Sequence, residues 1–290
     1  MTAFASQWTG RVFHTTLIGL ILIDIVSFAT LNTQAEVFLF VLLALAAIGV
    51  ALFKPEWLLP IVFAELISTS NGHGLNIELF GISVGIRMVL FAIALAATCV
   101  RVMRSRESVW PSSLRLGGIL LVILFVYATV SGFLRGYDVR DVYLDANGYF
   151  AIGYIWIASV WTTTALSRHA LYEACAAAVM WVAMKTLLFV FAFGHLHPVT
   201  LDPLYRWIRD TRLGEITLQV GNVYRVFLQS QWFLVPSALV TTAYILFSEQ
   251  RSVRETAPRI ALILFASSLL ISLSRSYWIG LIAGIVILAL

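Results

Sequence analysis

The sequence has 290 residues, of which 60% are hydrophobic and only 12% are charged, with a formal net charge of +4. Soluble domains carry about 25% charged residues, and one soluble core cannot bury this much apolar surface. A lipid bilayer can solvate such a surface, so the composition predicts an integral membrane protein. The positive charge does not indicate nucleic-acid binding, because most basic residues stand in short clusters between apolar runs, where they orient helices.

Apolar runs follow one another along the whole chain. Since about 20 apolar residues cross the hydrocarbon core of a bilayer, we predict an all-α, polytopic transmembrane helical bundle with about ten spans. The spans are expected at 12–31, 36–53, 56–70, 79–99, 116–134, 149–167, 171–194, 226–247, 260–274 and 277–290. Residues 1–290 then form a single transmembrane domain. The first run should stay uncleaved, because Asp24 interrupts it and no small-residue cleavage site follows.

Basic residues set the expected orientation of the bundle. With a cytoplasmic N-terminus, the two densest basic clusters, RVMRSRE at 101–107 and EQRSVRETAPR at 249–259, fall on the same side. The bias of arginine and lysine toward the cytoplasm therefore predicts an N-in topology. Some arginines remain on the outer side, and these are Arg135, Arg140, Arg206, Arg209, Arg212, Arg225 and Arg275. Most have acidic neighbours, whereas Arg225 and Arg275 have none and stand at the mouths of spans.

The longest outer connector covers residues 195–224. Asp202 and Pro203 suit the N-cap and the first position of a helix, and Gly214 suits its stop. The apolar residues of this helix would share one face, namely Leu204, Trp207 and Ile208. Its arginines would point elsewhere, namely Arg206, Arg209 and Arg212. The pattern predicts a short amphipathic helix on the membrane surface, serving either as a spacer or as a cationic platform for an anionic lipid-linked ligand.

Arg225 and Arg275 are the main candidates for ligand binding. A guanidinium stays charged and binds phosphate in a bidentate manner, so two of them at the outer boundary suit a diphosphate on a long lipid. The structural alternative is that both reach out to lipid headgroups. A break in the helix near Ser274 is expected, because one helix over 260–290 would be about 46 Å long, too long for a single crossing.

Two further cations, Arg87 and Lys185, lie inside predicted spans. A charge at such a depth costs about 2.5–3.5 kcal/mol on insertion scales and is a functional candidate by default. Asp24 and Glu65 are also within spans, so buried ion pairs without a catalytic role are the alternative.

Neither a metal site nor a cofactor is predicted. His195 and His197 could chelate a metal only with other ligands, and no H-E-x-x-H motif or Cys/His cluster accompanies them. Cys99 and Cys175 are far apart in the chain, which argues against a disulfide framework.

The segment SLSRSYWIGL, which follows a basic inner loop and an apolar run, resembles the serine/arginine signature of the O-antigen ligase and O-antigen polymerase superfamily. The segment GNVYRVFLQSQWFLVPSALV is similar to the upstream arginine motif of that superfamily. The resemblance implies a multi-pass, metal-independent glycosyltransferase of the bacterial inner membrane that acts in cell-envelope polysaccharide and lipopolysaccharide synthesis. Its donor would be a glycan on undecaprenyl diphosphate at the periplasmic face. Its acceptor would be lipid A-core, a growing polysaccharide or another molecule.

The same resemblance implies roles for particular residues. Arg225 and Arg275 would bind the diphosphate. Other residues would have accessory roles, namely Arg87, Arg206, Arg209, Arg212 and Ser274. The histidine that serves as general base in the superfamily lies in a large outer loop after the serine/arginine span. We expect the sequence to be truncated before that loop, and we assign the catalytic base to no residue.

Two other classes of function compete with this interpretation. A transporter or lipid-carrier flippase for envelope polysaccharide would line its pathway with the intramembrane charges, and internal repeats would favour it, but none is evident between the halves. A non-catalytic scaffold in an envelope assembly complex is the third class.

Overall fold

The computed structural model describes residues 10–69, 74–79, 82–105, 115–139, 141–142, 149–219, 223–247 and 256–289. Each predicted span contains a helix. These helices are α2 (Arg11–Thr30), α3 (Gln34–Phe53), α4 (Leu58–Ser68), α5 (Ile86–Ser105), α6 (Arg115–Leu134), α8 (Phe150–Trp161), α9 (Ala165–His195), α11 (Leu234–Phe247), α12 (Thr256–Ile271) and α13 (Arg275–Ala289).

Six helical segments of the described residues are long and apolar enough to cross a membrane. They are α2, α3, α5, α6, α9 and the segment Gln229–Phe247, in which a short 3-10 helix, η3 (Gln229–Phe233), leads into α11. The chain therefore has the helices of a membrane protein. The other helices are shorter, and α4 has only 11 residues. The ten-span topology stays a prediction.

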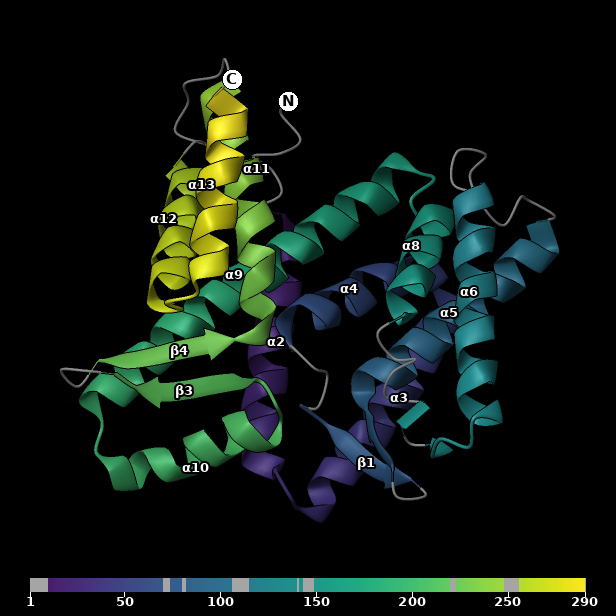
Figure 1. The fold of residues 1–290 in the computed structure, drawn as a ribbon, viewed down its shortest axis with the longest axis horizontal. Helices are drawn as coiled ribbons and strands as arrows, with labels where there is room; N and C mark the ends of the chain where they lie inside the picture. Colours follow the sequence, from purple (N-terminus) through teal and green to yellow (C-terminus); the bar gives the residue numbers. More distant parts are fainter. Residues whose placement is uncertain are drawn as a thin grey trace.

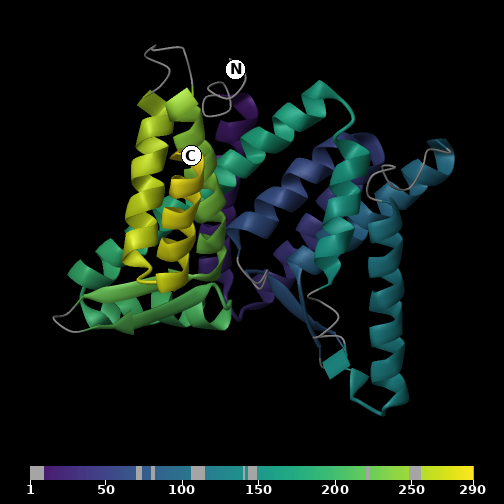
Figure 2. The ribbon, with the colours of Figure 1, turned by 45° about the horizontal axis from the view of Figure 1, so that its top comes forward.

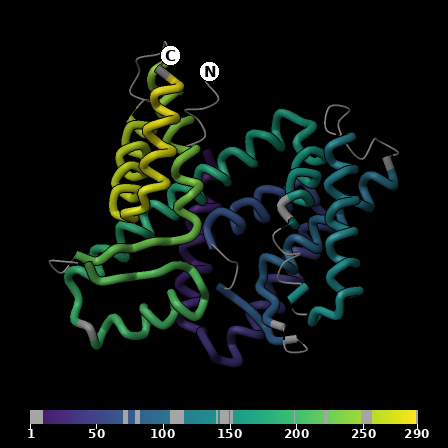
Figure 3. The backbone as a smooth tube through the Cα atoms, in the orientation of Figure 1, coloured from purple at the N-terminus to yellow at the C-terminus, as the bar shows by residue number. Residues whose placement is uncertain are grey.

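The helices run between two ends of the molecule (Figures 1 and 2). The start of α2 and the end of α13 lie at one end, together with the turn from α8 to α9. The opposite end carries the turn from α2 to α3, a helix labelled α10 (Pro198–Asp210) and a β-hairpin. The tube view shows the start of α2 and the end of α13 at the end of the molecule opposite to α10 (Figure 3).

Helix α9 is the centre of the fold. It has 31 residues and packs against α2, α4, α11 and α12. Small residues on α9 are fully buried, and these are Ala174, Ala177, Ala178 and Ala183. Their size lets the neighbouring backbones approach closely, as in other membrane helix bundles. A second apolar cluster joins α3, α4, α5 and α8, whereas most of α6 is exposed at the edge of the molecule (Figure 1).

Two short antiparallel hairpins interrupt the helices, which the all-α prediction did not anticipate. The first pairs β1 (Asn76–Leu79) with β2 (Ile82–Gly85), and the second pairs β3 (Gly214–Leu218) with β4 (Tyr224–Leu228). Two predicted spans, 79–99 and 226–247, therefore begin as strands. The strand segments ISVG at 82–85 and YRVFL at 224–228 carry β-branched and aromatic side chains that favour strands.

Helix α10 differs from the helix predicted in the outer connector. It begins at Pro198 with His197 as N-cap, and Pro203 lies inside it. Pro198 suits the first helical position as well as Pro203 does, so the sequence signal was ambiguous. The helix ends before Arg212, whose φ is 51°, and Gly214 instead begins β3. The predicted apolar face is present in part as a buried face, with Trp207 and Ile208 only 3% and 1% exposed.

Candidate ligand-binding site

Arg225 and the turn that precedes Arg275 meet in the structure, although they are far apart in the sequence. Arg225 lies on β4, opposite Thr217 of β3. Its Nε donates a hydrogen bond of 2.8 Å to the carbonyl oxygen of Ser272, directly after the end of α12. One edge of the guanidinium is thus fixed on the turn, and the group is half-buried.

Ring contacts reinforce this junction. The Phe227 and Tyr277 rings are stacked with centroids 5.9 Å apart, which joins β4 to the first turn of α13. The Arg225 guanidinium carbon lies 5.2 Å from the centroid of the Phe227 ring, within the range of a cation–π contact. The hairpin and the α12–α13 turn are therefore joined by a ring stack as well as by the hydrogen bond of Arg225.

The turn at residues 272–274 forms the break that the sequence predicted near Ser274. Leu273 adopts a φ of 50°, and the Ser272 hydroxyl accepts a hydrogen bond of 3.2 Å from the backbone N–H of Ser274. Ser274 precedes the first residue of α13, and its carbonyl accepts from the backbone N–H groups of Tyr277 and Trp278. Its hydroxyl lies 3.0 Å from that of Ser276.

Arg275 is the first residue of α13, and its side chain is exposed. Within the described ranges, the structure gives its guanidinium no hydrogen bond and no ion pair. The free N–H groups at the start of a helix carry a partial positive charge that favours anions. Arg275 and the α13 N-terminus therefore place positive charge three residues after Ser272, whose carbonyl holds Arg225.

The fully buried Gln231 holds β4 in place, and the sequence prediction did not single it out. Its side-chain nitrogen donates to the Thr186 hydroxyl on α9 at 3.0 Å and to the Val226 carbonyl at 3.3 Å. Its side-chain oxygen accepts from the Leu228 backbone N–H at 3.2 Å. The strand that carries Arg225 is thus fixed to the central helix. Only the position of Gln231 within the segment that resembles the upstream arginine motif could have indicated this role.

The arginines of α10 do not join this junction. Helix α10 packs against β3, whereas α12 packs against β4, so the hairpin separates them (Figure 1). Arg206 pairs with Asp202 at 2.8 Å and Arg209 with Asp210 at 2.8 Å. The hydrogen bond that Arg209 donates to Asp210 raises the pKa of the Arg209 guanidinium above its ordinary value. Both guanidinium groups are largely exposed, and such surface pairs contribute little stability.

Arg87 is engaged within the helices. Its Nε pairs with Glu65 at 3.1 Å, and its Nη2 donates to the Leu66 carbonyl and to the Thr69 hydroxyl. These partners lie in the last turn of α4 and directly after it. Arg87 therefore satisfies the C-terminal carbonyl end of a helix that stops inside the bundle, and it shares no described contact with Arg225 or Arg275.

Lys185, on α9, likewise binds a carbonyl group at the end of α4. Its Nζ pairs with Asp24 at 2.8 Å and donates to the Ser68 carbonyl at 2.9 Å, and Trp181 Nε1 donates to the same Asp24 oxygen at 2.7 Å. Lys185 is only 2% exposed. Both cations of the predicted spans are thus paired, Lys185 with Asp24 and Arg87 with Glu65.

The histidines of the outer connector have local partners. His195 stacks on Phe191 with centroids 4.6 Å apart, and His197 caps α10. In the part of the chain that the structure describes, no group of three or more His, Cys, Asp or Glu side chains could hold a metal ion.

No protein-family model matches the chain, and no curated protein and no solved structure shows detectable similarity to it.

Proposed function

We propose that the chain is a glycosyltransferase of the bacterial inner membrane, of the O-antigen ligase and polymerase superfamily. It would use a glycan on undecaprenyl diphosphate at the periplasmic face and pass it to lipid A-core, a growing polysaccharide or another acceptor. One observation carries the proposal: Arg225 is hydrogen-bonded to the turn that leads into Arg275. The two motifs that resemble the superfamily thus meet at one end of a set of membrane-spanning helices.

The chemistry requires cations at this place. In the transfer, an acceptor oxygen forms a bond to the anomeric carbon, and the bond from that carbon to the diphosphate oxygen breaks. Negative charge develops on the departing diphosphate, and fixed donors stabilise it without reorganisation. The Ser272 carbonyl holds Arg225 by its Nε, which leaves the Nη groups to face a ligand. Arg275 and the α13 N-terminus supply the second cationic group. The proton of the acceptor needs a base, which is assigned to no residue of this chain.

The distribution of charge supports the periplasmic assignment of the junction. Arg101 and Arg104 lie in the last part of α5 and Arg168 in the first turn of α9, and in Figure 1 these helix ends lie away from the hairpin. Since basic clusters favour the cytoplasmic side, the hairpin and the α12–α13 turn would face outward.

In a transporter, the charges inside the predicted spans would have to be available to bind the substrate. Lys185 and Arg87 are instead held by Asp24 and Glu65 and by carbonyl groups at the end of α4. This pairing favours a structural role for the deep charges, and leaves the outer arginines as the functional ones.

The test is complementation of a bacterium that lacks its envelope-glycan ligase or polymerase, with the full-length gene and with Arg275→Ala, Arg225→Ala and Arg225→Lys. Arg275→Ala is the sharpest variant, because its side chain makes no described contact that the fold needs. Loss of one preorganised donor to the transition state lowers the rate about 100-fold or more. Arg104→Gln, an exposed arginine at the other end of the molecule, is the matched control, and membrane fractionation checks insertion.

Long glycans with the wild type and with Arg104→Gln, and their loss with Arg275→Ala at normal insertion, would support the proposal. Full activity of both Arg225→Ala and Arg275→Ala would refute the site. If the wild type restores nothing while lipid-linked oligosaccharide accumulates on the cytoplasmic side, the protein acts before transfer, as a flippase would.

A further inference from the structure

A pocket with aromatic and polar walls lies at the end of α6, apart from the arginine junction. Its volume is about 690 Å³, within the usual range of small-molecule sites. Its walls come from the last turns of α6, from Arg135, Tyr137, Asp141 and Val142 after that helix, and from Tyr149 at the start of α8. In Figure 1 the end of α6 and the β3–β4 hairpin lie on opposite sides of the molecule.

The backbone places Arg135 at the pocket in a defined way. The N–H of Tyr137 donates to the Gly132 carbonyl at 3.3 Å, and the N–H of Gly136 donates to the Phe133 carbonyl at 3.0 Å. Gly136 has a φ of 77°, a conformation that favours glycine. Together these features form a Schellman motif, in which Arg135 is the C-cap of α6. The motif fixes where the Arg135 side chain leaves the helix.

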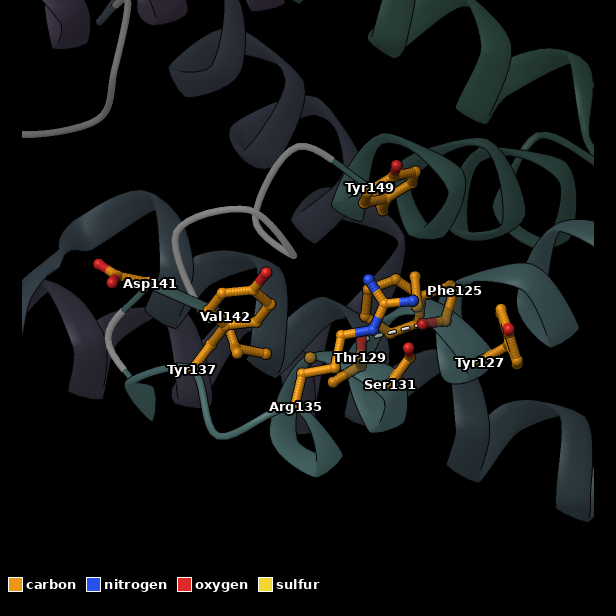
Figure 4. Close-up of a pocket in the computed structure, with 11 residues that line it drawn as sticks. Phe125, Tyr127, Thr129, Ser131, Arg135, Tyr137, Asp141, Val142 and Tyr149 are labelled. Atoms are coloured by element: carbon orange, nitrogen blue, oxygen red, sulfur yellow. Dashed lines mark hydrogen bonds between the residues drawn. The ribbon is translucent and has the colours of Figure 1, made fainter.

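The Arg135 guanidinium is available to a ligand. In Figure 4 it projects toward the centre of the pocket, whereas the Asp141 carboxylate points away from it. Of the residues that the structure describes, none forms an ion pair or a side-chain hydrogen bond with Arg135, Asp141 included. A guanidinium carries five N–H donors and is not deprotonated in proteins. A permanent cation with free donors therefore faces an open cavity.

The other walls suit a hydroxylated ligand. Tyr137 and Tyr149 bring phenolic hydroxyl groups, and Ser131 brings an aliphatic one. Phe125 and Thr129 belong to the wall that α6 forms (Figure 4). The Thr129 hydroxyl donates to the Phe125 carbonyl at 2.9 Å, so its oxygen can accept a hydrogen bond from a ligand. Aromatic rings with a polar tip are apt at a boundary where one side is apolar and the other is wet.

We propose that this pocket binds the phosphate ester of a polyol, with Arg135 on the phosphate and the tyrosine and serine hydroxyls on the polyol. Arginine binds phosphate in a bidentate manner, and charge-assisted bonds of this kind are about twice as strong as neutral ones. The same chemistry comes from two sources, the headgroup of an anionic glycerophospholipid and a phosphorylated sugar. The proposal needs neither Arg225 nor Arg275, so it is independent of the proposed transferase activity.

The test uses the whole chain in phosphatidylcholine nanodiscs. Native mass spectrometry measures how much phosphatidylglycerol the protein retains when this lipid is added. Calorimetric titration measures the binding of soluble glycerol phosphate and glucose phosphate, with glycerol and glucose as neutral controls. Arg135→Gln should weaken binding of the phosphate compound about tenfold or more, the loss expected for a hydrogen bond to a charged group. Arg104→Gln should bind as the wild type does.

Each outcome decides the question. Selective retention of phosphatidylglycerol that Arg135→Gln loses identifies a lipid headgroup as the occupant. Binding of glucose phosphate that Arg135→Gln loses, without lipid selectivity, identifies a sugar phosphate. Arg135→Lys keeps the charge but not the planar fork, so it should fall between the wild type and Arg135→Gln. Equal behaviour of the wild type and Arg135→Gln toward both lipid and soluble phosphates overturns the proposal.

Discussion

Replacement of Lys185 by methionine should strongly destabilise the protein. Lys185 Nζ is bonded to Asp24 at 2.8 Å and to the Ser68 carbonyl at 2.9 Å, and only 2% of the residue is exposed. Methionine has a similar length but no charge and no donor. It would leave the Asp24 carboxylate with only the Trp181 N–H and the Ser68 carbonyl with no cation.

The magnitude follows from the uncompensated charge. Removal of one partner of a buried ion pair costs about 3–5 kcal/mol, because the other partner stays desolvated. Asp24→Asn in the same chain removes that charge. We therefore expect the double variant Asp24→Asn/Lys185→Met to recover about 2 kcal/mol relative to the sum of the single variants, within the range of coupling found for contacting residues.

The assay is thermal or denaturant unfolding of the purified protein in nanodiscs, for both single variants and the double variant. Lys54→Met is the matched control, since Lys54 is exposed between α3 and α4 and forms no salt bridge with another described residue. A Lys185→Met cost no larger than that of Lys54→Met would refute the reasoning. It would mean that Lys185 and Asp24 are hydrated in the membrane, as in a transport pathway.

Two other substitutions probe the support of the candidate site. Gln231→Leu should cost about 2–4 kcal/mol in the free energy of unfolding, because it leaves the Val226 carbonyl and the Leu228 N–H without their side-chain partner. The same substitution at the exposed Gln229 should be nearly neutral. Equal melting temperatures of the two variants would contradict the role of Gln231. Gly214→Ala should destabilise by about 1–3 kcal/mol, because a Cβ there would meet the Phe227 carbonyl oxygen of the paired strand. Gly49→Ala, in a helix with open space around that position, should instead be neutral or slightly stabilising, and the comparison is made by thermal unfolding.

The positions of the helices could be predicted from the sequence, because a bilayer requires long apolar runs and charges stand at their ends. The short helices were less predictable. Residues 56–70 were predicted as a span, yet α4 has only 11 residues. It can end inside the bundle because Arg87 and Lys185, from other parts of the chain, donate hydrogen bonds to carbonyl groups of its last turn. No local pattern encodes that compensation. The hairpins were missed for a related reason, since ISVG and YRVFL are as apolar as a helix and differ only in β propensity.

The candidate site, too, could be predicted from the sequence only in part. Charge patterning predicts an outer position for Arg225 and Arg275, but that pattern fits equally well with side chains that reach out to lipid headgroups. The tertiary structure decided that Arg225 bonds to the turn before Arg275, and that α10 lies on the other side of the hairpin with its own arginines paired to Asp202 and Asp210.

The sequence by itself determined that this protein belongs in a membrane, since hydrocarbon selects for apolar length, a property that any window of the chain displays. Only the tertiary structure decided which charges are paired inside the fold and which are exposed. Ion pairing depends on distances between residues far apart in the chain, such as Asp24 and Lys185, and the low dielectric of the membrane interior gives those distances their energetic weight.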